Sequence, residues 1–415
     1  MKTTDTERRR APFIRRGGVA LACGALVTTT VLPAAANPAR PVPAATSRPA
    51  LDRAARNVVA AGAVGYLAHV RDGDHVITAR AGLADRRTGR PIGTDDQFEI
   101  GSNTKTFVAT VILQMVARGR LALTDSIEKH LPGLVPGGDK ISVRRILNHT
   151  SGIFNYTDDP SFMGPIEAGS QRRWTPRELV RIAVEHGPDF PPGAGWNYSN
   201  TNYVIAGMIA EKVSGRPLAD LIEDRIARPL GLRRTSLVKD TVRYTGPGFA
   251  HGYLVHFTSV PEATYTDTSS SPIGSWGGAA GAMISTPGEL ATFFSALLGG
   301  RLLPDAQLAQ MRETVPMSTK NPDTGYGLGL MRRQTACGPM WGHGGDTMGH
   351  HSTAVVSDDG RRVAVTDLTT EPATEESTPV GETRGERFGS AAGDAEATAD
   401  CLALGRPVPA RSSTS

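Results

Sequence analysis

Apolar and polar residues follow two different periods along this 415-residue chain. Near both chain ends they alternate at every second residue, which predicts strands, and through the middle apolar residues recur every three or four positions, which predicts helices. The predicted strands cover residues 63–70, 75–81, 340–342, 351–356 and 362–368. The predicted helices cover residues 51–61, 176–185, 201–213, 218–226 and 286–298. We therefore expect an α+β fold: one antiparallel sheet, built from both chain ends and flanked by helices, with an inserted, mostly helical lobe.

The first residues have the pattern of an export signal. Six Lys and Arg residues precede an apolar run at 19–31, and Ala34-Ala35-Ala36 offers a small-residue cleavage site. The apolar run is too short and too rich in Thr for a membrane span, so we expect a secreted protein with no stable span after cleavage. The chain then divides into a signal peptide at 1–36, a Pro/Ala-rich linker at 37–50, a folded domain at 51–404 with a mobile polar loop at 371–393, and a disordered tail at 405–415.

Removal of this leader changes the charge of the protein. The leader holds six of the 45 Lys and Arg residues and two of the 41 Asp and Glu residues, so the remainder carries 39 of each and no net charge. No basic field remains that would attract nucleic acid or an anionic membrane, and we expect neither as a partner.

The cysteines fit an exported protein. Once Cys23 is removed with the leader, Cys337 and Cys401 remain, an even pair in an oxidising compartment. We predict a disulfide between them, which would pin a last predicted helix at 395–404 to the strand after Cys337. Two unrelated buried thiols are the alternative.

A nucleophile is predicted at Ser102. The pattern Ser-x-x-Lys occurs three times, at Ser102/Lys105, Ser126/Lys129 and Ser236/Lys239, but only the first follows a predicted strand and begins a helix with buried spacing. At a helix start, free N–H groups and the helix dipole favour negative charge. Lys105 lies one turn later on the same face, within reach of the Ser102 hydroxyl.

A serine hydroxyl becomes a good nucleophile only when a neighbour takes its proton. Lys105 can do this as a free amine if burial lowers its pKa. Tyr198, in Tyr198-Ser199-Asn200, can do it as a phenolate if the cationic Lys105 stabilises that form. The sequence leaves both open. Asn200 is predicted to orient Lys105 and to donate its amide to a substrate carbonyl.

The third motif, His343-Gly344-Gly345, is predicted to border the cleft. His343 would open the bordering strand, and Gly345 would let the substrate backbone approach closely. The backbone N–H groups of Ser102 and Asp346 would then form an oxyanion hole.

These three ordered motifs resemble those of the serine beta-lactamase-like hydrolases, in particular class C beta-lactamases and exported D-alanyl-D-alanine carboxypeptidases. The resemblance runs over residues 51–401 and includes Leu147-Asn148-His149-Thr150-Ser151-Gly152, Ser275-Trp276 and the run Gly325 to Leu330. It implies an acyl-enzyme on Ser102, a beta-lactamase/transpeptidase-like fold and no cofactor. It also implies a peptidoglycan stem peptide or another small amide or ester as substrate, beta-lactams as inhibitors or substrates, and a monomer.

The chain departs from those carboxypeptidases at two positions. Gly344 replaces the Thr whose hydroxyl helps to hold a terminal carboxylate, and Met331 stands where an Arg commonly follows the Gly-Leu-Gly-Leu run. We expect Arg333 to supply the missing charge from the next inward position of the strand. An esterase or class C-like beta-lactamase with the same machinery is therefore the first alternative to a penicillin-sensitive carboxypeptidase. A penicillin-binding sensor without turnover is the second.

Three further features remain to be assigned. Trp276 either lines the cleft or packs in the core, and His149 is expected to be a hydrogen-bonded structural residue. His343, Asp346, His350 and His351 resemble a set of metal ligands. No metal is expected, because neighbouring strand residues point to opposite faces and His350 and His351 cannot then bind the same ion.

Overall fold

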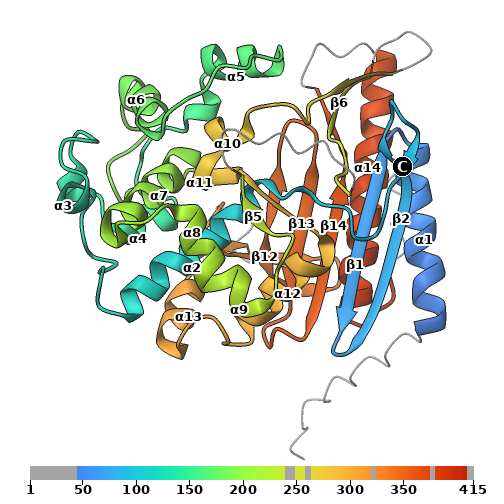
Figure 1. The fold of residues 1–415 in the computed structure, drawn as a ribbon. Coiled ribbons are helices and arrows are strands. Elements are labelled where there is room, and N and C mark those ends of the chain that lie inside the picture. Colours follow the sequence, from blue (N-terminus) through green and yellow to red (C-terminus); the bar gives the residue numbers. More distant parts are fainter. Residues whose placement is uncertain (1–43, 239–247, 258–262, 319–323, 374–378, 409–415) are drawn as a thin grey trace, which may run out of the picture. The chain divides into compact units, whose positions relative to one another are not determined.

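The central sheet joins the two ends of the chain (Figure 1). The computed structural model describes residues 44–238, 248–257, 263–318, 324–373 and 379–408. Within these residues, nine strands form one antiparallel sheet in the order β3-β2-β1-β14-β13-β12-β11-β10-β9. Strand β1 pairs with β14 from Tyr66 opposite Leu368 to Asp72 opposite Arg362. The predicted α+β class and the sheet built from both ends are confirmed.

The strands of this sheet are β1 Gly65–Asp72, β2 His75–Asp85, β3 Arg90–Pro91, β9 Val315–Pro316, β10 Gly325–Tyr326, β11 Met331–Thr335, β12 Gly338–Asp346, β13 His351–Val356 and β14 Arg362–Leu368. Two three-stranded sheets accompany it. Their strands are β4 Phe98–Glu99, β5 Ser236–Leu237 and β8 Met283–Ser285 in one, and β6 Tyr253–His256, β7 Thr264–Asp267 and β15 Thr370–Pro372 in the other.

Helices cover both faces of the sheet. They are α1 Ala44–Ala60, α2 Thr104–Ala117, α3 Ile127–His130, α4 Val143–Leu147, α5 Pro160–Glu167, α6 Pro176–His186, α7 Asn200–Ser214, α8 Leu218–Ile222, α9 Arg228–Leu230, α10 Ile273–Trp276, α11 Gly278–Gly281, α12 Pro287–Leu298, α13 Asp305–Arg312 and α14 Pro379–Ala403. Short 3₁₀ turns precede several of them, and the turn η1 Gly101–Asn103 leads directly into α2. In the described residues, no helix is long and apolar enough to cross a membrane.

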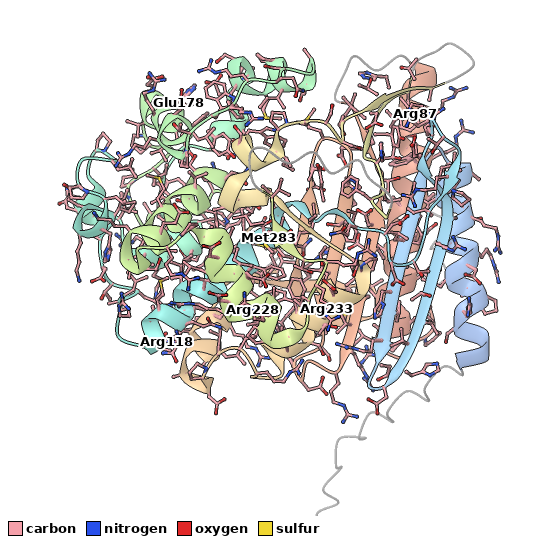
Figure 2. All side chains as sticks on the ribbon, viewed as in Figure 1. Arg87, Arg118, Glu178, Arg228, Arg233 and Met283 are labelled. Carbon is pink, nitrogen blue, oxygen red and sulfur yellow. A yellow bond between two sulfur atoms is a disulfide. The ribbon has the colours of Figure 1, made fainter. Side chains whose placement is uncertain are left out.

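Two apolar cores explain this arrangement. On one face of the sheet, α1 and α14 pack through residues such as Leu51, Phe388 and Ala399. On the other face the larger core includes α2, which is buried on nearly every side from Thr104 to Met115. A helix that is apolar all round belongs inside a core, so the sequence places α2 at the centre. Figure 2 shows the labelled arginines at the surface and Met283, which is fully buried, between the elements.

Three expected boundaries are corrected by the structure. Helix α1 begins at Ala44, inside the expected linker, and α14 begins at Pro379, inside the expected mobile loop. The glycines of α14 obscured its pattern, but Phe388, Ala395 and Ala399 recur at helical spacing and pack on the sheet. Arg406, in the expected disordered tail, donates its backbone N–H to Cys401 O at 2.8 Å. Residues 1–36, predicted to be the signal peptide, lie outside the described residues.

Candidate active site

The turn η1 presents Ser102 against the end of β12. Gly101 has a φ of +50°, which glycine adopts without strain. A Cβ atom at Gly101 would lie only 2.7 Å from Asp346 N. The backbone of the nucleophile turn therefore lies directly on the strand end that was predicted to complete the oxyanion hole.

The side chain of Lys105 reaches back one helical turn to Ser102. Its Nζ lies 2.9 Å from Ser102 Oγ, 2.7 Å from Asn200 Oδ1 and 2.7 Å from the backbone oxygen of Ala280. Lys105 is 0% exposed, and this burial lowers its pKa well below the usual value, although the Asp346 carboxylate opposes the shift. Desolvation disfavours the charged ammonium and so favours a neutral amine.

These contacts determine where the lone pair of a neutral Lys105 points. The oxygens of Asn200 and Ala280 can only accept hydrogen bonds, so they take the two N–H groups of the amine. The lone pair then faces Ser102 Oγ, where it can accept the hydroxyl proton. The position of Asn200 is itself fixed, because its Nδ2 donates to Thr157 Oγ1 at 3.0 Å. The structure thus brings Ser102, Lys105 and Asn200 together as the sequence predicted.

Tyr198 lies beside the same group. Its phenol neighbours the Ser102 hydroxyl, which opposes the larger effect of burial on the pKa of the phenol, and Lys105 Nζ lies 4.8 Å from the centre of its ring. Burial raises the pKa of Tyr198 above its usual value, so the phenol is neutral at physiological pH. Lys105 Nζ lies over the face of the ring, where a cation–π partner would lie. A group in this position does not stabilise the phenolate oxygen directly.

His149 supports Tyr198, a role that the sequence analysis did not foresee. The two ring centres are 4.4 Å apart, and His149 Nδ1 accepts the backbone N–H of Ser199 at 3.1 Å. Among the described residues, His149 is the one non-glycine with a positive φ, at +62°. Such strain persists only where the surroundings hold the residue in place. The LNHTSG segment of the sequence was the available signal.

His343 is a neutral, fully engaged residue. Its Nδ1 donates to the backbone oxygen of Gly344 at 2.6 Å, and its Nε2 accepts the hydroxyl of Tyr326 at 2.9 Å. Burial lowers its pKa to about 3. His343 was expected to open its strand but lies inside β12.

Gly345 is required for a different reason from the one expected. A Cβ atom at this position would lie 2.0 Å from the backbone oxygen of Ile100, the residue before the nucleophile turn. The protein's own backbone, rather than that of a substrate, is therefore what approaches Gly345 closely. A Cβ atom at the neighbouring Gly344 would have its nearest contact at 3.8 Å, which is ordinary packing.

Asp346 belongs to a small polar cluster with His351 and Glu371. Asp346 Oδ1 lies 2.5 Å from His351 Nδ1, and metal-binding atoms of all three residues lie within 4.8 Å of one another. The Asp346 carboxylate raises the pKa of His351 to about 9, and burial raises that of Glu371 to about 7. His351 is therefore an imidazolium paired with Asp346 at neutral pH, which does not suit metal binding.

Arg333 does not lie in the site, so its expected role was wrong. It pairs with Met340, whose side chain belongs to the core on the α14 face, and its guanidinium binds Glu396 at 2.6 Å. Trp276 packs in the core, where its Nε1 donates to Ser271 Oγ at 3.0 Å.

The predicted cysteine pair connects α14 to the sheet. The structure joins Cys337, in the turn before β12, to Cys401, with Cα atoms 5.1 Å apart. The presence of this disulfide in the exported protein stays a prediction.

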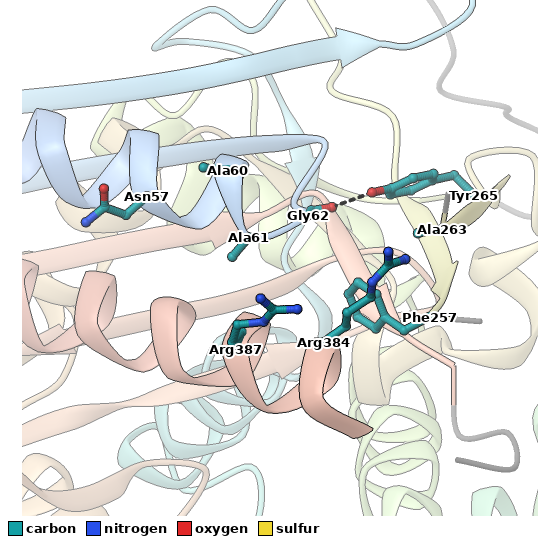
Figure 3. Close-up of a pocket in the computed structure, with 9 residues that line it drawn as sticks. All are labelled: Asn57, Ala60, Ala61, Gly62, Phe257, Ala263, Tyr265, Arg384 and Arg387. Atoms are coloured by element: carbon teal, nitrogen blue, oxygen red, sulfur yellow. Dashed lines mark hydrogen bonds between the residues drawn. The ribbon is translucent and has the colours of Figure 1, made fainter. Parts of the chain in front are cut away.

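A cavity on the other side of the molecule carries none of this chemistry. Figure 3 shows it between the end of α1, the start of α14 and the β6–β7 hairpin. Its volume is about 460 Å³. Its wall includes Phe257 and Tyr265, whose hydroxyl donates to Gly62 O at 2.9 Å. None of the three motifs lines it.

Comparisons with known proteins agree with this geometry. The family model described as Beta-lactamase matches residues 51–386. Esterase EstB of Burkholderia gladioli is 33% identical over 197 residues, which cover 45% of this chain and 50% of the esterase. Penicillin-binding protein 4* of Bacillus subtilis is 33% identical over 190 residues, 44% of this chain and 40% of that protein. The chain thus spans about half the length of these curated relatives.

Solved structures match over more of the chain. A D-stereospecific amidohydrolase from a Streptomyces species has a TM-score of 0.72 and 44% identity, covering 78% of this chain and 94% of its own. The D-amino acid amidase of Ochrobactrum anthropi has a TM-score of 0.71 and 29% identity, covering 84% and 98%. The Beta-lactamase family model spans most of the chain, and Ser102 and Lys105 lie in the matching fold. This protein is therefore a serine hydrolase that belongs to the Beta-lactamase family.

Proposed function

We propose that the protein is an exported amidohydrolase that forms an acyl-enzyme on Ser102 and cleaves amide bonds of D-configured residues, acting as a monomer without a cofactor. The observation that carries the proposal is the hydrogen bonding of Lys105, which directs a neutral amine at Ser102 Oγ. The likeness to amidohydrolases specific for D-compounds supports the substrate class.

Acylation would begin with proton transfer from Ser102 to Lys105. As the Oγ–carbon bond forms, the carbonyl electron pair moves onto oxygen, which would accept the backbone N–H groups of Ser102 and Asp346. The C–N bond then breaks, and the leaving nitrogen takes a proton from the Tyr198 phenol, which lies beside Ser102. Lys105 returns a proton to Tyr198, and water later hydrolyses the ester. Positioned proton transfer of this kind contributes about 10²- to 10⁴-fold to rate.

The polar side chains at the end of β12 favour a leaving group without a carboxylate. Gly344 and Asp346 lie two positions apart and so share one side of the strand. A carboxylate held beside Gly344 would meet the carboxylate of Asp346 and compete with it for His351, whereas Arg333 is bound to Glu396. A carboxylate without a cationic partner is costly to desolvate.

A D-alanyl-D-alanine carboxypeptidase is the second candidate. Relatives of that name in Salmonella are 26% identical over 261 residues, and the acylation residues are the same ones. An ester substrate is supported by the likeness to EstB. The intact contacts of Lys105 count against a sensor without turnover.

The test compares substrates that differ only at the leaving group. The purified, secreted protein is given D-alanine amide, L-alanine amide, a peptide ending in D-Ala-D-Ala, a p-nitrophenyl ester and fluorescent penicillin. We expect ammonia release from the D-amide at least tenfold faster than D-alanine release from the peptide. Faster cleavage of the peptide would overturn the amidase proposal in favour of the carboxypeptidase.

The nucleophile and export are tested in the same preparation. Ser102→Ala should abolish every activity, while Ser126→Ala should leave all of them unchanged. Peptide mapping of the covalent adduct should locate it on Ser102, and a label on another serine would refute the assignment. Protein recovered from the culture medium should begin near residue 37, and retention of the intact leader inside the cell would refute export.

A further inference from the structure

A buried polar network lies behind the Ser102 turn and takes no part in the proton transfers above. It consists of Glu99, His350 and Asp367, whose exposed fractions are 7%, 1% and 0%. His350 Nδ1 donates to Asp367 Oδ2 at 3.2 Å. Burial raises the pKa values of Glu99 and Asp367, and the Asp367 carboxylate raises that of His350.

Such a network is expensive to keep. Moving ionisable groups out of water costs several kcal/mol each, and apolar residues of similar volume often stabilise a core better. Two polar atoms of the network, His350 Nε2 and Asp367 Oδ1, have no hydrogen-bond partner among the described residues. The network is therefore not explained by stability alone.

Thr347 connects the network to the turn between β12 and β13. Its hydroxyl accepts the backbone N–H of His350 at 3.1 Å and opposes the effect of burial on the pKa of the neighbouring Glu99. Its own N–H donates to the backbone oxygen of His350 at 2.9 Å. Thr347 thus closes the turn from both directions, once with its side chain and once with its backbone.

The segments that contain Glu99 and Thr347 carry the predicted oxyanion hole. Glu99 lies two residues before Gly101, and Thr347 directly follows Asp346. The close approach of Gly101 to Asp346 N shows that these backbones touch at this point. A shift of the β12–β13 turn would therefore move the Asp346 N–H relative to the Ser102 N–H.

We propose that Thr347 is a positioning residue, which holds the Asp346 N–H in the direction needed to stabilise the oxyanion formed at Ser102. This inference rests on the proposed acyl-enzyme function. Its side chain acts through the backbone of the turn and not on the substrate. His350, which Thr347 binds through the backbone, is in turn held by its hydrogen bond to Asp367.

The central variant is Thr347→Val, which removes the hydroxyl and keeps the shape. Loss of a whole oxyanion-hole donor costs about 10²- to 10³-fold in kcat, and partial misalignment should cost about 10- to 100-fold. We expect that fall in kcat with KM changed less than about threefold. The affinity for a boronic acid, which forms a tetrahedral adduct with Ser102, should fall by the same factor. Thr347→Ser keeps the hydroxyl and should restore both.

The controls separate positioning from folding. Thr398→Val removes a buried hydroxyl that donates to a backbone oxygen in α14, so it reports the general cost of such a change. Thr347→Ala, which also removes the hydroxyl, provides a second variant if Thr347→Val fails to fold, with the same expected pattern of reduced kcat and boronic acid affinity. If wild-type protein acylates and these variants lower only the melting temperature, the positioning role is refuted. If wild-type protein itself does not acylate, the proposed function has failed instead.

Discussion

Substitution of Gly345 by Ala is the sharpest steric test of this site. The added Cβ atom would lie 2.0 Å from the Ile100 carbonyl oxygen, whereas Cβ atoms essentially never approach such atoms within 3.0 Å. The strand and the segment leading to Ser102 must therefore separate by about 1 Å. A displacement of that size in the reacting groups can cost about 10²-fold in rate.

We expect Gly345→Ala to lower kcat/KM about 100-fold and to reduce the free energy of unfolding by about 1–3 kcal/mol, as overpacking usually does. Gly344→Ala is the matched control, because its Cβ atom would have its nearest contact at 3.8 Å. Its kcat/KM should change less than threefold.

The assay measures the acylation rate of both variants with the same amide or ester, alongside urea unfolding. Equal activity of Gly345→Ala and wild type would show that the contact between β12 and the Ser102 segment does not set the catalytic geometry. Equal losses in the two variants would show that any side chain on this strand is harmful, and the steric reasoning would then be wrong.

Three further predictions concern protons, charge and the cysteine pair. Because burial lowers the pKa of Lys105, its neutral amine is present at neutral pH, and kcat/KM should fall as the pH falls through that lowered value. The double variant Lys105→Ala with Tyr198→Phe should be little less active than either single variant. Multiplicative losses in rate assays would instead show that the two residues act independently. The double variant Gly344→Thr with Asp346→Asn adds a hydroxyl and removes a negative charge, whose repulsion of a substrate carboxylate is worth about 1 kcal/mol at an exposed position. Cleavage of a peptide ending in D-Ala-D-Ala should therefore rise about fivefold relative to cleavage of the amide. An unchanged ratio would show that other residues select the carboxylate. The double variant Cys337→Ser with Cys401→Ser removes a link between residues 64 positions apart. Denaturant titration should show that the free energy of unfolding falls by up to about 4 kcal/mol. Free thiols in the secreted protein would refute the disulfide.

The residues that the sequence predicted correctly depend on local spacing. Ser102 and Lys105 lie one helical turn apart, and the apolar positions after them identified a buried helix without knowledge of the partners. The contact of Asn200 with Lys105 was predicted from the motif Tyr198-Ser199-Asn200. The Ala280 oxygen, which helps to direct the Lys105 lone pair, has no side-chain signal and could not have been found.

The predictions that failed depend on long-range pairing. The face on which Arg333 lies is set by its register with Met340, which no count along one strand reveals. Helix α14 was missed because its glycines lower helix propensity, while packing against the sheet supplies the stability that propensity lacks. Gly101 and Asp346 are 245 positions apart in the chain, so their close approach appears only in the folded structure.

The pairing of β1 with β14 also determines when the enzyme becomes active during synthesis. About 300 residues separate Tyr66 from Leu368, and closing a chain segment of that length costs about 5 kcal/mol of entropy before any contact compensates for it. Strands β12 and β13, which lie against the Ser102 turn and carry the turn at Asp346, and β14, which joins them to β1, are among the last to leave the ribosome. A nascent chain therefore holds its nucleophile long before it holds a catalytic site. A fragment ending at residue 361, before β14, should remain unacylated by any substrate of the complete protein.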